Sequence, residues 1–137
     1  MLRSVLRTVF LLPLVLPALA FAADEEISLE LNTGETVNNQ CRLTFVIENK
    51  SKAAIDTFKL DLVVFNRENR MFRRNLVEMG PMRPAKTVVK FYPVDGPCTE
   101  IRSVLVNDVT ACAPAKPEVC VDNLTLSSRM DGVRLYK

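Results

Sequence analysis

A dense group of basic residues in the middle of the chain is its strongest candidate for binding chemistry. Six bases fall within twenty residues, diluted there only by Glu68 and Glu78. The predicted binding residues are Arg67, Arg70, Phe72, Arg73, Arg74, Arg83 and Lys86. Guanidinium groups bind carboxylates and phosphates, and the phenyl ring would add an apolar anchor. The group predicts docking of an acidic protein or of an anionic envelope polymer such as lipopolysaccharide. The alternative is charge that only protects a sheet edge from aggregation.

Most hydrolytic chemistry is excluded by composition. The chain contains no histidine, which removes Ser-His-Asp and Cys-His nucleophilic systems and His-ligated metals. Paired carboxylates are left as a possible acid and base, and the candidates are Asp24, Glu25, Glu26, Asp95, Glu100, Asp108 and Asp122. They fall near the start of the mature chain or at strand ends, where acids usually face water. The glycines are spread singly, without a phosphate loop. We expect no enzyme activity and no cofactor.

Three methionines offer thioethers, which suit Cu(I) in an exported protein. Met71, Met79 and Met82 lie close in sequence, but neither histidine nor a free thiolate accompanies them. Packing in a small core is the better interpretation, so we expect no metal site.

The first twenty-two residues have the layout of a secretory signal peptide. Arg3 and Arg7 form a positive start, an apolar run covers residues 9–19, and Ala20-Phe21-Ala22 is a small-residue cleavage motif. Two prolines interrupt the run, which is shorter than the roughly 20 residues of a spanning helix. We therefore prefer a cleaved signal to a membrane anchor. The mature chain is expected to cover residues 23–137 as one domain, in the periplasm or secreted, without a transmembrane segment.

Loss of the signal segment changes the charge balance. The chain holds eighteen Lys and Arg and sixteen Asp and Glu. Two of the bases precede residue 23 and all the acids follow it, so the mature domain has sixteen of each and is formally neutral. Net charge therefore gives no support to a nucleic-acid partner, and only a local basic group would attract anions.

Short runs of alternating apolar and polar residues indicate β-strands with one buried face. The predicted strands cover residues 27–32, 41–48, 56–65, 71–77, 87–92, 100–107 and 121–128, and 132–136 would add an edge. The first is expected to end in a turn at Thr33-Gly34. The third is expected to be central, because both of its faces carry apolar residues. Seven strands without an amphipathic helix favour an all-β, immunoglobulin-like antiparallel β-sandwich, with a barrel as the alternative.

Four cysteines in an exported domain predict two disulfides. Cys98 and Cys112 flank one extended strand and are too far apart to pair. Cys112 and Cys120 bracket a short loop whose two prolines allow it to fold back, which leaves Cys41 with Cys98. In an immunoglobulin-like order the strands that begin at Cys41 and after Cys98 run parallel on facing sheets. A metal or redox site is the alternative, but no Cys-x-x-Cys motif is present.

Two segments resemble known envelope proteins. Residues 41–49, CRLTFVIEN, and 58–65, FKLDLVVF, resemble the second and third strands of bacterial envelope modules with immunoglobulin-like or fibronectin type III-like folds. Residues 98–108, CTEIRSVLVND, are similar to part of small uncharacterised periplasmic proteins of proteobacteria. The resemblance covers residues 27–126 and implies a role in binding a protein partner or in envelope maintenance. It transfers no functional residue and no ligand.

Overall fold

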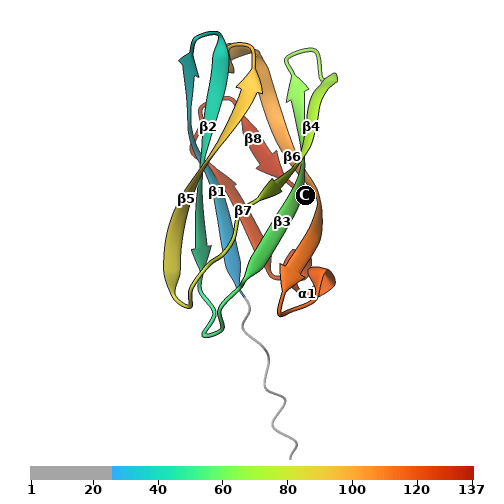
Figure 1. Cartoon of the computed structure of the whole chain (residues 1–137). Helices are drawn as coiled ribbons and strands as arrows, with labels where there is room; N and C mark the ends of the chain where they lie inside the picture. Colours follow the sequence, from blue (N-terminus) through green and yellow to red (C-terminus); the bar gives the residue numbers. More distant parts are fainter. Residues whose placement is uncertain (1–25) are drawn as a thin grey trace, which may run out of the picture.

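The chain folds into a β-sandwich of two four-stranded sheets (Figure 1). The computed structural model describes residues 26–137, and the predicted signal segment lies outside the described residues. The first sheet has the order β5-β2-β1-β7, with β1 at Ile27–Val37, β2 at Gln40–Asn49, β5 at Lys86–Asp95 and β7 at Leu124–Ser128. The second has the order β4-β3-β6-β8, with β3 at Thr57–Asn66, β4 at Met71–Glu78, β6 at Ile101–Ala113 and β8 at Arg134–Tyr136. The predicted fold class and sandwich are confirmed, with eight strands in the described part of the chain.

Alternating side chains place the core between the two sheets. Every second residue of β2 is fully buried, namely Cys41, Leu43, Phe45 and Ile47. Strand β3 contributes Phe58, Leu60, Leu62 and Val64 to the same core. It also lies between β4 and β6, so its predicted central position is confirmed. Burying one face of each sheet against the other removes these apolar side chains from water, which is the main stabilising term.

The strand pairing is mostly antiparallel, but two pairs are parallel. β7 pairs parallel with β1, and β8 pairs parallel with β6. The two C-terminal strands are the exceptions to the predicted antiparallel pairing, and each forms one edge of its own sheet. As a result β4 and β5 are the edge strands on the opposite side of the sandwich.

Both predicted disulfides are present, and they lie at opposite ends of the sandwich. Cys41 at the start of β2 is bonded to Cys98 in the short 3-10 helix η1 (Cys98–Glu100), with Cα atoms 4.7 Å apart. This bond joins the two sheets beside the β1–β2 turn. Cys112 near the end of β6 is bonded to Cys120, with Cα atoms 6.5 Å apart.

The predicted turn at Thr33-Gly34 is wrong. Strand β1 continues to Val37, and the turn is formed by Asn38 and Asn39 with φ of 50° and 59°. Two positive φ angles fit the type I′ turn of a tight hairpin, which favours asparagine. A bulge between Leu31 and Thr33 breaks the alternation that would have carried the strand further. Gly34 serves close packing instead, because an added Cβ would lie 2.6 Å from Met130 Cε.

Three further boundaries differ from the sequence expectation. β5 runs past Pro93, which an edge strand tolerates because one side of its backbone is unpaired. β6 extends to Ala113, and bulges against β3 accommodate its extra length. The six-residue helix α1 (Pro117–Asp122) was not predicted, and because of it the last predicted strand begins only at Leu124. A proline at its first turn starts this helix without a lost hydrogen bond.

A buried asparagine ties together the loops at the end opposite the β1–β2 turn. Asn49 is fully buried at the end of β2. Its side-chain Nδ2 donates to the carbonyl oxygens of Ala53 at 2.8 Å and Arg83 at 3.2 Å. Its Oδ1 accepts from both the backbone N–H and the hydroxyl of Ser51. One side chain therefore holds the β2–β3 loop against the β4–β5 loop.

Candidate functional site

The predicted basic residues are spread over the length of the sandwich. Arg67 and Arg70 lie in the β3–β4 hairpin loop, whereas Arg83 and Lys86 lie at the far end, where β5 begins. Eight residues of β4 separate the two groups, which at about 3.3 Å per residue is about 26 Å. Arg83 and Lys86 border a hollow of about 350 Å³ with Met82 and Val88. The structure thus brings the seven residues together only in smaller groups.

The two central arginines point to opposite faces of β4, and each pairs with a carboxylate. Arg73 forms an ion pair with Asp95 of β5, which links the two edge strands. Asp95 also accepts a hydrogen bond from Gln40 at 3.1 Å. Arg74 pairs with Asp61 on the outer face of the second sheet. Phe72 is 37 % exposed on the same strand. Both central arginines are therefore engaged within the domain, which leaves less of their charge for a partner.

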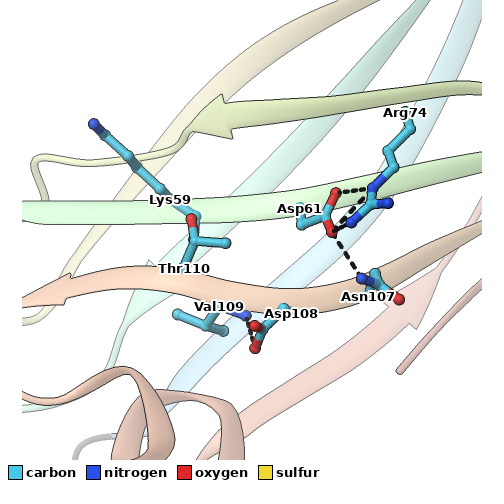
Figure 2. Close-up of polar contacts among 7 residues, drawn as sticks. All are labelled: Lys59, Asp61, Arg74, Asn107, Asp108, Val109 and Thr110. Carbon is cyan, nitrogen blue, oxygen red and sulfur yellow. Dashed lines mark hydrogen bonds and ion pairs between the residues drawn. The ribbon is translucent and has the colours of Figure 1, made fainter.

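Asp61 is the one buried carboxylate among residues 26–137, and its partners come from the two neighbouring strands (Figure 2). Arg74 on β4 donates from Nε at 3.0 Å to Oδ1 and from Nη2 at 2.7 Å to Oδ2. Asn107 on β6 donates to Oδ2 at 2.7 Å. The hydrogen bonds from Arg74 hold the pKa of Asp61 below its usual value, with help from Asn107, although burial opposes the shift. The bidentate pair links β3 to β4, and the hydrogen bond from Asn107 links β3 to β6.

The stability of the domain should fall in acid because of this carboxylate. The folded pKa of Asp61 lies below the value of about 3.9 for an unfolded aspartate, so its stabilisation is complete above about pH 5. It is lost as the pH falls through about 4 towards the folded pKa. In urea unfolding, Asp61→Asn should be less stable than the parent near neutral pH, and the difference should shrink in acid. A matched change at the exposed Asp131, Asp131→Asn, should show no such shrinking difference; an equal one would contradict the assignment to Asp61.

Exposed apolar side chains gather on the two edge strands. Seven large hydrophobic residues are exposed among residues 26–137: Val37, Met71, Phe72, Leu76, Val89, Phe91 and Val119. Five of the seven lie on β4 and β5. On β5, Val89 and Phe91 alternate with the buried Tyr92 and Val94 and therefore point away from the core. Their exposed fractions are 52 % and 60 %.

The most developed of these exposed regions is the Phe91 surface, defined by Val37, Arg42, Val89, Phe91 and Pro93. Side chains from β1, β2 and β5 meet there on the outer face of the first sheet, since Arg42 is paired in register with Pro93. A hollow of about 330 Å³ is bordered by most of this surface together with Asn38 and Gln40. The Arg42 guanidinium carbon lies 5.3 Å from the centre of the Phe91 ring and also forms an ion pair with Glu35. The surface therefore has an apolar centre, an oriented arginine and an amide rim.

Sequence reasoning missed the Phe91 surface, although a signal for it was present. The predicted strand 87–92 carries apolar residues on both faces, because Val89 and Phe91 alternate with Val88 and Tyr92. Apolar residues on both faces of a strand indicate that its outward face exposes apolar side chains when the strand lies on a surface.

The three methionines that were considered as metal ligands lie in different environments. Met79 and Met82 pack in the core, as predicted, while Met71 is exposed. Within residues 26–137, no group of three or more His, Cys, Asp or Glu is placed to hold a metal ion. No helix in this part of the chain is long and apolar enough to cross a membrane. The two disulfides fit an oxidising compartment outside the cytoplasm.

Comparison with known proteins does not assign this chain to a family. No protein-family model, no curated protein and no solved structure matches this chain.

Proposed function

We propose that this domain is a non-enzymatic interaction module of the bacterial periplasm that binds a protein partner through the Phe91 surface. The observation that carries the proposal is the exposed apolar centre of this surface, where Val89 is 52 % and Phe91 60 % exposed and a hollow lies beside the Phe91 ring. Exposed apolar patches with a polar rim are typical of interaction sites. Aromatic residues and arginine dominate the binding energy of such sites, and here an arginine is stacked on the exposed ring.

The partner docks on side chains and does not extend the sheet. Edge strands invite the addition of another strand unless charges or proline block them. On β5, Pro93 lacks a backbone N–H, and Lys90 points to the inner side, where it donates to the Gly80 carbonyl at 3.3 Å. The ion pair between Arg73 and Asp95 crosses the same side of the sandwich. The proline, the lysine and the ion pair protect the edge of β5 from pairing with another strand, whereas the outward face of β5 remains apolar. The partner is therefore a protein that places an apolar side chain in the hollow beside Phe91.

Capture from envelope extract tests the proposal. The immobilised domain is compared with Phe91→Ser and with the matched control Leu76→Ser, which removes an equally exposed apolar residue from β4. A protease-sensitive partner should be retained by the parent and by the control, and its affinity should fall at least about tenfold with Phe91→Ser. Equal retention by all three would place binding elsewhere. Size-exclusion chromatography of the parent shows whether the retained partner is a second copy.

A second candidate is a binder of anionic envelope polymer such as lipopolysaccharide through the predicted bases. The observation in its favour is that Arg67, Arg70, Arg83 and Lys86 have no carboxylate within ion-pair distance among residues 26–137. Ionic strength separates the two candidates. Polymer binding through arginines should weaken steeply with salt, whereas binding through an apolar centre should weaken little.

A further inference from the structure

We propose that a second site, formed by Arg67, Arg102 and Arg134 around Gly132, binds a phosphate group. The three arginines come from distant parts of the sequence: the β3–β4 loop, the start of β6 and the start of β8. Together with Gly132 and Val133 they line a surface hollow of about 330 Å³. Arg102 and Arg134 were not among the predicted binding residues, and only the topology brings them to Arg67. The site is independent of the Phe91 surface, which lies on the other sheet.

The fold holds two of the three guanidinium groups in place. Arg67 donates from Nε to the Thr99 carbonyl at 2.8 Å and from Nη1 to the Gly132 carbonyl at 3.1 Å. These bonds use two of its five N–H groups, so the rest are available to a ligand. The Arg134 guanidinium carbon lies 5.1 Å from the centre of the Tyr136 ring. Ser103 of β6 is paired with Arg134 of β8. Its neighbour Arg102 is the extra residue at a register shift against β3, and it lines the same hollow as Arg134.

The charge around the hollow is not neutralised by the domain itself. No carboxylate among residues 26–137 comes within 4 Å of the charged nitrogens of these three arginines. Glu68 and Glu100 line a neighbouring hollow that Arg67 also borders, but neither carboxylate forms an ion pair with Arg67. Three like charges directed at one hollow repel one another, and an anion would relieve that repulsion.

Phosphate fits this arrangement better than a single carboxylate does. A guanidinium fork binds phosphate oxygens through paired hydrogen bonds, and three forks match the several oxygens and the higher charge of phosphate. The volume falls at the lower end of the range of about 300–1,000 Å³ for small-molecule sites. It leaves room for the group to which the phosphate is attached. The same chemistry serves free phosphate and phosphate displayed on a lipid headgroup.

NMR titration of the folded domain tests the site. The probes are inorganic phosphate and vesicles of phosphatidylcholine with or without phosphatidylglycerol. The expected result is a saturable response centred on the amides of Gly132 and Val133. Saturation by inorganic phosphate identifies a site for free phosphate, whereas a response only to vesicles with phosphatidylglycerol identifies displayed phosphate. No saturable response to either probe would overturn the proposal.

Variants that each remove one positive charge distinguish binding at this site from a general attraction of anions to the basic residues. Arg102→Gln and Arg134→Gln should each weaken binding about tenfold, the loss of one charge-assisted contact. Lys52→Gln removes one positive charge from the exposed β2–β3 loop at the far end of the sandwich and should leave the affinity unchanged. Equal weakening by all three variants would overturn the proposal, because binding would then follow net charge. Phe91→Ser should still bind phosphate, so failure of the proposed partner surface is distinguishable from failure of this site.

Discussion

Replacing Cys41 and Cys98 together by alanine should lower the free energy of unfolding by about 4 kcal/mol. The disulfide closes a loop with a sequence separation of 57, and the loss of chain entropy in the unfolded state grows with loop length. The bond also joins the two sheets at the end of the β1–β2 turn, where Cys41 is fully buried. Because domains of this size are stable by only about 5–15 kcal/mol, this bond is a large part of the total. Urea unfolding of the double variant measures the loss.

The second disulfide supplies the matched control. Cys112 and Cys120 are separated by only eight positions, so the same reasoning gives a loss of about 2.5 kcal/mol for the corresponding double alanine variant. Neither variant leaves an unpaired thiol from the broken bond. A loss from the short loop equal to or greater than that from the long loop would show that loop entropy does not govern the stability of this sandwich.

Asn49→Asp should destabilise the domain by about 3 kcal/mol or more at neutral pH, although the two side chains have nearly the same shape. The change replaces the donor Nδ2 by a carboxylate oxygen that faces the carbonyl oxygens of Ala53 and Arg83. A fully buried charge without a compensating donor is among the most destabilising changes in a protein. The loss should shrink as the pH falls towards about 4, since a protonated carboxyl can donate again.

Unfolding of this variant at several pH values is compared with Asn38→Asp as a control. Asn38 lies in the exposed β1–β2 turn at a positive φ, which aspartate also tolerates. Its replacement should change the stability by less than about 0.5 kcal/mol. A small effect at Asn49 would mean that the two loops do not depend on this side chain.

The sheets could be predicted because their alternation is strong. Apolar residues at every second position of β2 and β3 predicted both strands. The pairing of Cys41 with Cys98 was predicted by elimination and supported by the parallel course of facing strands in an immunoglobulin-like order. The turn at Asn38 and Asn39 was missed because the bulge after Leu31 interrupts the alternation and a glycine follows it. Helix α1 has only six residues, which is too short to show a helical period.

The candidate sites were less predictable, because they depend on which strands become neighbours. Closeness in sequence suggested that the bases from Arg67 to Lys86 form one group. Adjacent residues of a strand point to opposite faces, so Arg73 meets Asp95 while Arg74 meets Asp61. Conversely, Arg67 and Arg134 are far apart in sequence and line one hollow. Only the parallel attachment of β8 to β6 brings them together.

The parallel pairing of β1 with β7 also determines when this domain can fold. The hydroxyl of Thr125 donates to the Ile27 carbonyl, 98 positions away, so one of the first strands to be synthesised completes its hydrogen bonding with one of the last. A high share of such contacts slows folding to milliseconds or seconds. Until residues 124–128 arrive, one side of β1 is an unpaired edge and is open to association with other chains. The nascent domain is thus at its most vulnerable to aggregation before β7 is in place.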